Sequence, residues 1–266
     1  MPTMAEAIGE ALPLAKSAVE QGARMIFLPE YAGGLKSEGR RIAPPSSHEE
    51  THEFLAAMRG FARDNAVWMQ IGSVAIDGPD GKLINRGYML DDQGEIVARY
   101  DKIHLFDVDL GEGAVYRESD TVCSGSEAAV YYTGFARIGH TICYDLRFPG
   151  LFRDLAQAGA EILCCPAAFT KLTGEAHWHI LNQARAIENT RFMVSACAVG
   201  DVPGGGQTYG HSLIIDPWGK VLADGGHQPG VIGSEIDLDL VAETAAKVPS
   251  LTHDRVYEKP QNRSQR

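Results

Sequence analysis

The feature that most constrains the fold is a regular alternation of helical patterns with short apolar segments. Between residues 4 and 21, apolar side chains recur at helical spacing, and Gly22 ends the pattern. Residues 24–28 then form a nearly unbroken apolar run, which ends at Pro29 and Glu30. Such a run is typical of a strand buried on both faces, because it offers no polar side to water. It predicts a layered α/β domain in which helices cover mixed sheets.

The same alternation continues along the chain and includes two hairpins. One hairpin has its turn at 91–94, and the other has strands at 212–216 and 220–223. The remaining helices and strands follow from periodicity and from turn residues. Helices are predicted at 49–65, 151–158, 176–189 and 240–247, and strands at 67–76, 128–132, 136–142, 162–165, 192–199 and shortly before the last helix.

Composition limits the classes of partner and of site. The 266 residues, 44% of them hydrophobic, show no composition shift, so we expect one domain over residues 1–266. The net charge of -11 without a basic cluster argues against nucleic-acid or anionic-membrane partners. No apolar stretch is long enough to span a bilayer and no signal-peptide pattern begins the chain, which favours a cytoplasmic protein. Five scattered cysteines predict free thiols rather than a disulfide framework or a zinc site.

Three groups with chemical potential follow predicted strands. Glu30 and Cys143 each stand where a strand ends, and Lys102 follows the hairpin strand among apolar and acidic residues. In α/β proteins, ligands gather outside the carboxyl ends of strands. Each group also has a simpler interpretation: Cys143 as a small buried hydrophobe and Lys102 as a solvated loop cation. Together, however, a carboxylate, an ammonium and a thiol supply a base, an electrostatic clamp and a nucleophile.

The segments FLPE, YDKIHLFDVD and GHTICYDLRFP, in this order, resemble the three catalytic signatures of the nitrilase (carbon–nitrogen hydrolase) superfamily. The segments HLFDVD, CYDLRFP and TGEAHW most resemble its Nit-type branch, which includes omega-amidase and deaminated-glutathione amidase. The resemblance covers essentially the whole chain except the first strand of the family, which we expect this sequence to lack. It implies a four-layer αββα sandwich with mixed sheets, and a homodimer or larger homo-oligomer.

The resemblance also implies the roles of individual residues. Glu30 corresponds to the general base, Lys102 to the oxyanion stabiliser and Cys143 to the nucleophile. Glu118 corresponds to a second glutamate that positions substrate and lysine, and Tyr116 and Tyr144 are expected to contact substrate, with the Tyr144 backbone N–H as a second oxyanion donor. The implied reaction hydrolyses a small amide through a thioester and uses neither a metal nor an organic cofactor.

Substrate and reaction leave alternatives open. Arg147 is expected either to bind a substrate carboxylate or to form an ion pair with Asp145 or another acid. The leading function is an amidase that releases ammonia from a carboxylate-bearing amide. The alternatives are a nitrilase or a carbamoyl or acyl transferase of the same superfamily, and a non-catalytic dimeric interaction protein.

Several other groups have simple structural interpretations. Arg185 and Glu188, three residues apart on a predicted helix, are expected to pair with each other. His177 and His179 do not form a metal-ligand pair, since side chains two residues apart on a helix point in different directions. Cys164 and Cys165 are expected in the core, and residues 204–206 form a glycine loop near the pocket.

Overall fold

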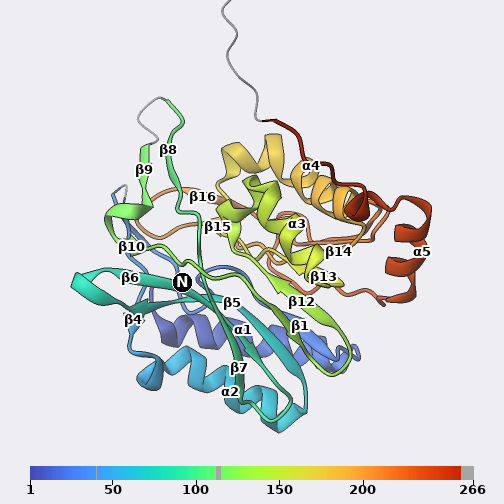
Figure 1. Ribbon diagram of the computed structural model, residues 1–266. Coiled ribbons are helices and arrows are strands. Elements are labelled where there is room, and N and C mark those ends of the chain that lie inside the picture. Colours follow the sequence, from blue (N-terminus) through green and yellow to red (C-terminus); the bar gives the residue numbers. More distant parts are fainter. Residues whose placement is uncertain (40, 112–114, 259–266) are drawn as a thin grey trace, which may run out of the picture.

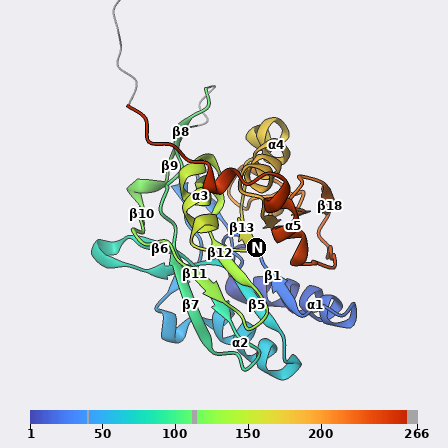
Figure 2. The same cartoon turned by 45° about the vertical axis from the view of Figure 1, so that its right-hand side comes forward.

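Two six-stranded sheets are stacked at the centre of the molecule, and helices cover the outer face of each. The computed structural model describes residues 1–39, 41–111 and 115–258. Figures 1 and 2 both show α1 (Met4–Glu20) and α2 (Glu53–Asn65) on one side and α3 (Pro149–Gln157) and α4 (Lys171–Asn189) on the opposite side. A shorter helix, α5 (Asp239–Lys247), follows near the C-terminal end of the described chain.

Both sheets contain parallel and antiparallel neighbours. In the first, β1 pairs in parallel with β5, which pairs antiparallel with β6; in the second, β12, β13 and β14 are parallel and the outer strands antiparallel. The first sheet contains β1 (Met25–Phe27), β4 (Ser46–Ser47), β5 (Trp68–Asp77), β6 (Leu83–Leu90), β7 (Ile96–Asp101) and β10 (Val122–Cys123). The second contains β11 (Val130–Tyr132), β12 (Arg137–His140), β13 (Ile162–Cys164), β14 (Phe192–Ser195), β17 (Leu213–Ile215) and β18 (Val221–Asp224).

Short elements connect the sheets and surround their edges. Three two-stranded ribbons are formed by β2 (Ser37–Glu38) with β3 (Arg41–Ile42), β8 (Asp107–Asp109) with β9 (Val115–Arg117), and β15 (Val199–Asp201) with β16 (Gln207–Tyr209). The 3-10 helices are η1 (Glu49–Thr51), η2 (Pro79–Gly81), η3 (Glu118–Asp120), η4 (Cys143–Arg147) and η5 (Ser250–Thr252). Two of these, η3 and η4, carry predicted site residues.

Three apolar cores separate the four layers. One lies between α1, α2 and the first sheet, and a second lies between α3, α4 and the second sheet. The third lies between the two sheets, where Met89 and Ala98 of the first sheet belong to the same cluster as Ile138, Phe192 and Ile214 of the second. This arrangement confirms the predicted αββα sandwich.

The structure corrects several predicted boundaries. The helix at 49–65 divides at His52, whose side chain accepts the Leu55 N–H, into η1 and α2. Helix α4 begins at Lys171 rather than at 176, after an extended Thr170. The strand expected over 192–199 divides into β14 and β15. The strand expected before the last helix is wrong: residues 225–238 form no strand, and this stretch is rich in glycine.

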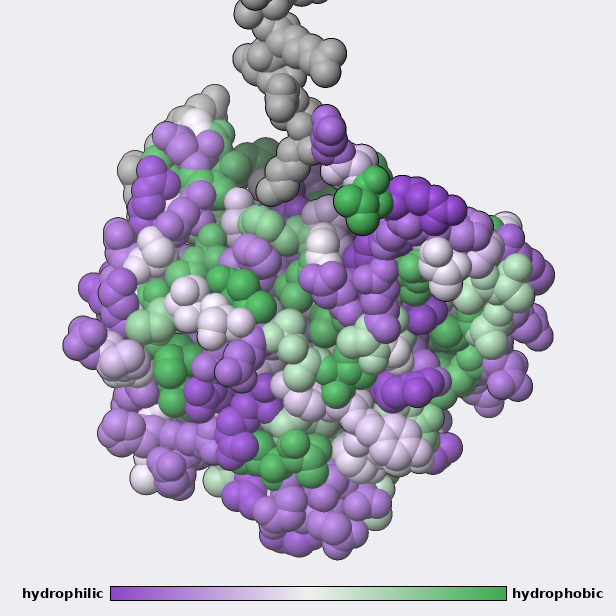
Figure 3. Space-filling model, viewed as in Figure 1, coloured by the Kyte–Doolittle hydropathy of each residue, from purple (hydrophilic) through white to green (hydrophobic). Residues whose placement is uncertain are grey.

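The surface of the described chain gives no sign of a membrane-spanning helix. Over residues 1–39, 41–111 and 115–258, no helix combines the length and the apolar character needed to cross a bilayer. Hydrophobic and hydrophilic residues are intermixed over the face seen in Figure 3.

The close packing of Gly87 on the first sheet against His140 on the second can be tested by mutation. A Cβ added at Gly87 of β6 would overlap the ring of His140 on β12 and lie 2.7 Å from the Gly72 carbonyl oxygen. We therefore expect Gly87→Ala to lower the free energy of unfolding by about 1–3 kcal/mol, because a packed interior cannot absorb an added carbon without shifting.

The measurement is urea unfolding of Gly87→Ala beside the control Gly9→Ala. Gly9 is exposed on α1 with open space around its Cβ position, so alanine there should stabilise by about 0.5–1 kcal/mol. Equal stability of Gly87→Ala and the parent protein would contradict the tight contact between the sheets.

Candidate active site

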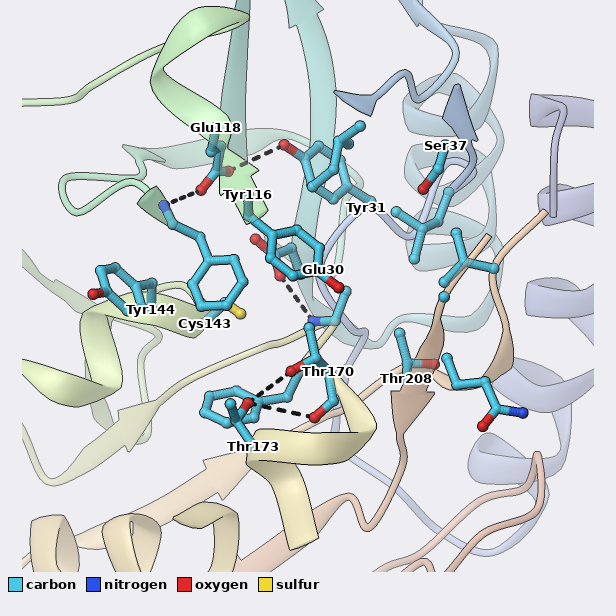
Figure 4. Close-up of a pocket in the computed structure, with 18 of the residues that line it drawn as sticks. Glu30, Tyr31, Ser37, Tyr116, Glu118, Cys143, Tyr144, Thr170, Thr173 and Thr208 are labelled. Atoms are coloured by element: carbon cyan, nitrogen blue, oxygen red, sulfur yellow. Dashed lines mark hydrogen bonds between the residues drawn. The ribbon is translucent and has the colours of Figure 1, made fainter. Parts of the chain in front are cut away.

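A pocket opens at the ends of strands from both sheets, and the predicted site residues meet there. Glu30 follows β1, Lys102 follows β7, Glu118 begins η3 and Cys143 begins η4 after β12. All four line the same cavity, together with a group of aromatic and polar side chains (Figure 4). The structure thus brings together residues that are up to 113 positions apart in the chain, the interval from Glu30 to Cys143.

Lys102 lies between two buried carboxylates. Its ammonium Nζ donates to Glu30 Oε1 at 3.0 Å and to the two Glu118 oxygens at 3.0 and 2.8 Å. The lysine side chain is 2% exposed and the two glutamates are 3% and 2% exposed, so the alternative of a solvated loop cation is wrong. Burial alone would lower the pKa of Lys102, but Glu118 and Glu30 raise it well above its usual value. The lysine therefore stays cationic at neutral pH.

Each glutamate is also fixed by donors other than the lysine. Glu30 accepts the Asn85 side-chain amide at 2.9 Å on Oε1 and the Ala168 backbone N–H at 2.8 Å on Oε2. Glu118 accepts the Phe106 backbone N–H at 2.6 Å and the Tyr31 hydroxyl at 3.4 Å. Sequence reasoning missed Asn85 and Tyr31; a polar residue inside a buried strand and an aromatic directly after Glu30 were the available signals.

Cys143 is held in an unusual backbone conformation. Its φ is +51°, in the left-handed region, and its N–H donates to the Pro166 carbonyl at 2.9 Å. A side chain in this region costs about 1–3 kcal/mol and persists only where the surroundings impose it. The turn starts η4: the Asp145 N–H donates to the Ile142 carbonyl at 3.1 Å, whereas the Tyr144 N–H, the second of the helix, has no acceptor inside it. Cys143 is 8% exposed and its side chain lines the cavity.

The environment of Cys143 keeps its thiol protonated. Burial raises the pKa of Cys143 well above its usual value, and the neighbouring Glu30 carboxylate raises it further, against an opposing effect of Lys102. A protonated thiol is a poor nucleophile, so the site requires a base to remove the proton when substrate is bound. Glu30, the adjacent carboxylate, is placed to accept it.

Asp145 connects the cysteine turn to the segment after Lys102. This carboxylate is fully buried and accepts four bonds. Its Oδ2 accepts the Ile142 N–H at 2.8 Å and the Tyr100 hydroxyl at 2.7 Å, and its Oδ1 accepts the His104 N–H at 3.0 Å and contacts His104 Nδ1 at 2.7 Å. One of the two alternatives for Arg147, an ion pair with Asp145, is therefore wrong, since Asp145 binds other partners.

Arg147 lies behind two aromatic side chains of the pocket wall. Its guanidinium carbon is 5.4 Å from the centre of the Phe169 ring and 5.9 Å from that of Tyr144, and Nη2 is 3.3 Å from His177 Nδ1. Phe169 and Tyr144 line the cavity, whereas Arg147 is not among the lining residues. Within the described residues no acid forms an ion pair with this arginine.

The remaining wall combines aromatic rings with hydroxyl and amide groups. Tyr116 and Tyr144 both line the cavity, as predicted for residues that contact substrate, and Phe106 lies 5.1 Å from each ring. Gly205 and Gly206 also line it, which places the glycine loop at the pocket. Sequence reasoning missed the polar members of this wall, which are Ser37, Thr170, Thr173, Gln207 and Thr208.

The simpler interpretations of other residues are confirmed. Arg185 Nη1 donates to Glu188 at 2.9 Å, and the same guanidinium binds the Leu146 carbonyl at the end of η4. Cys164 and Cys165 are fully buried. His177 contacts Arg147, whereas His179 contacts Asp224, so the two histidines point in different directions.

Comparisons with known proteins agree with this geometry. A family model described as carbon-nitrogen hydrolase matches residues 2–246. Deaminated glutathione amidase from Synechocystis sp. is 39% identical over 264 residues, which cover 96% of this chain and 94% of that protein. Omega-amidase from Xenopus tropicalis is 32% identical over 248 residues, covering 93% and 89%. The crystal structure of the C. elegans NitFhit protein superposes with a TM-score of 0.84 at 31% identity, covering 95% of this chain and 62% of that one. On these matches, the chain belongs to the carbon-nitrogen hydrolase family.

Proposed function

We propose that the protein is a cysteine-dependent amidohydrolase that cleaves the carbon–nitrogen bond of a small linear amide bearing a carboxylate, and releases ammonia. The observation that carries this proposal is the meeting of Cys143, Glu30 and Lys102 at one cavity, with the lysine cationic between two carboxylates. The family, and relatives named deaminated glutathione amidase and omega-amidase, support the same reaction.

In the first half of the proposed reaction, Glu30 takes the proton of Cys143 as the sulfur attacks the amide carbonyl. The negative charge that develops on the carbonyl oxygen is stabilised by Lys102 Nζ and by the Tyr144 backbone N–H. That N–H is the second of η4 and has no acceptor inside the helix. Collapse of the tetrahedral intermediate expels ammonia, which takes a proton from Glu30, and leaves a thioester on Cys143.

In the second half, Glu30 removes a proton from water as the water attacks the thioester carbonyl. The same donors stabilise the second oxyanion, and the acid leaves as the thiolate regains its proton. Glu118 takes no proton in this scheme; its two contacts with Lys102 hold the ammonium toward the cavity. Tyr116 and Tyr144 contact substrate, and no step requires a cofactor.

The dimer implied by the family resemblance stays a prediction. Large apolar side chains exposed on α4 and on the turn between β17 and β18 support it, because a surface of this kind favours burial against another chain. These side chains are Leu172, Ile180, Ile187 and Trp218.

Cys143 is expected to be the nucleophile. Purified protein is expected to release ammonia from α-ketoglutaramate or deaminated glutathione, and Cys143→Ala should lower the rate at least about 10³-fold, because no other group can form the thioester. Glutamine and an aliphatic nitrile serve as comparison substrates, and Cys123→Ala, a change at the one partly exposed cysteine of the described residues, serves as the control variant.

Equal turnover by Cys143→Ala would refute the proposed mechanism. Turnover of the nitrile alone would assign a nitrilase instead. A folded protein that turns over none of these compounds, and whose Cys143 shows no preferential labelling by iodoacetamide, would favour the non-catalytic interaction protein.

Arg147 does not itself line the cavity, so a role in binding the substrate carboxylate requires its guanidinium to turn from the Phe169 and Tyr144 rings toward the cavity when substrate binds. Arg147→Lys should raise KM for acidic amides roughly 10–100-fold and leave KM for neutral amides nearly unchanged, because lysine cannot provide the bidentate fork. Arg153→Lys, on α3 and paired with Asp254, is the matched control. Equal losses for acidic and neutral amides would reject this role.

Asp145 is expected to act as a positioning residue. In Asp145→Asn, one carboxylate oxygen is replaced by an NH₂ group. This group faces N–H or O–H donors that now bind that oxygen, and the resulting repulsion should shift the cysteine turn. We expect kcat to fall about 10²-fold with a smaller change in KM, since a displacement of about 1 Å is enough for such a loss. Asp154→Asn on the exposed face of α3 is the control. A fall in thermal stability with kcat unchanged would show a purely structural role.

A further inference from the structure

Outside the pocket, three histidines and one aspartate from three separate segments converge. His179 lies on α4, His211 in the connection between β16 and β17, Asp224 at the end of β18 and His227 in the turn that follows. These four residues, here the histidine cluster, include none of the residues that line the pocket. The proposed amidase reaction uses none of them.

The ligand-forming atoms of the cluster are close together. His179 Nε2 is 3.0 Å from Asp224 Oδ2, and His211 Nδ1 is 2.7 Å from Asp224 Oδ1. The ligand atoms of these three residues lie within 4.8 Å of one another. On the other side of the His211 ring, its Nε2 is 3.1 Å from His227 Nε2.

Backbone bonds hold the cluster in place. The indole of Trp178, which is fully buried on α4 beside His179, donates to the His211 carbonyl at 2.7 Å. The His211 N–H donates to the Gly226 carbonyl at 2.7 Å, and the Gly226 N–H donates to Asp224 Oδ1 at 2.9 Å. His211 itself has a φ of +53°. The backbone contacts of His211 and Gly226 therefore fix the positions of the cluster residues.

We propose that His179 Nε2, His211 Nδ1 and the Asp224 carboxylate bind a divalent first-row transition ion of the Zn²⁺ type. Ligand atoms about 2.0–2.2 Å from a tetrahedral Zn²⁺ lie roughly 3.3–3.5 Å apart, which small side-chain rotations would reach from the present separations. Binding replaces the two N–H···O bonds to Asp224, since each coordinating nitrogen gives up its proton. A water molecule would take the fourth position.

His227 completes the arrangement as an outer partner. When His211 coordinates through Nδ1, its Nε2 carries the proton and donates to His227 Nε2. Histidines that bind metals commonly donate their second N–H in this way, and the partner fixes the tautomer and the orientation of the ring.

Charge favours a cation at this place. Among the described residues, only histidines form ion pairs with Asp224, so no lysine or arginine neutralises it. The net charge of the chain is -11. Neutral imidazole nitrogens with a carboxylate oxygen form a ligand set suited to Zn²⁺ and related ions.

A bound ion would fasten the outer helix to the hairpin of the second sheet. It would connect α4 with the end of β18 beside Tyr209, whose ring packs against His179 and His211. Tyr209 lies on β16, the strand that supplies Gln207 and Thr208 to the pocket wall. The expected role is therefore structural: the ion stabilises this side of the sandwich.

The test uses the 266-residue chain with Zn²⁺ and Co²⁺ as probes. After metal loading and gel filtration we expect one Zn²⁺ per chain and a higher Tm. His179→Gln and Asp224→Asn should lose both effects, and His227→Ala should weaken binding about 10–100-fold. His253→Ala removes an exposed histidine outside the cluster and should change neither. Cys143→Ala should retain the ion, and bound Co²⁺ should show no thiolate charge-transfer band.

Two results would overturn the proposal. The first is equal retention of Zn²⁺ by the parent protein and by folded His179→Gln and Asp224→Asn. This result would show that the ion binds elsewhere, and the cysteine thiols would be tested next. The second is a folded parent protein that retains no Zn²⁺, which would leave the cluster as a hydrogen-bonded network. Neither result depends on amidase activity.

Discussion

The contact of Lys102 with Glu30 and Glu118 is the interaction on which the site depends. Three charged groups are removed from water, and such burial is tolerated only where every charge is paired and hydrogen-bonded. The structure meets this condition with additional donors: Asn85 and Ala168 on Glu30, and Phe106 and Tyr31 on Glu118. The two carboxylates and one ammonium leave one net negative charge beside a neutral thiol.

The side chains around the Cys143 thiol come from both sheets, and each lies in a segment that follows a strand. Glu30 and Lys102 follow strands of the first sheet, and Cys143 follows a strand of the second. Asp145 connects these two halves, because its carboxylate accepts both the His104 N–H and the Ile142 N–H and so joins the cysteine turn to the segment after Lys102. The close approach of Gly87 to His140 has the same consequence deeper in the core, because it fixes the distance between the sheets.

Much of this arrangement was predictable from sequence, for identifiable reasons. Buried strands ended by polar residues predicted the positions of Glu30 and Cys143, and the resemblance of three ordered segments predicted which groups meet. The wall residues Thr170, Thr173 and Thr208 were not predictable, because their place depends on where α4 begins and on a ribbon remote in sequence. The buried state of Lys102 and the true partners of Asp145 also depend on tertiary packing. The histidine cluster was missed because its members come from three segments and have no common spacing.

The origin of Glu30's partners has a consequence for how the protein acquires activity during folding. The pairing of Lys102 with Glu30 and with Glu118 needs only the first 118 residues. The contact of Glu30 with Ala168 spans 138 positions, and Cys143 comes later in the chain than the charged groups. Contacts of such long range form late, because closing large loops costs chain entropy before the contacts compensate for it. A growing or refolding chain can therefore bring Lys102 and the two glutamates together first. Cys143 joins them only when the second sheet packs against the first. Competence for chemistry is in this sense a property of the complete tertiary structure, because the site draws on both sheets.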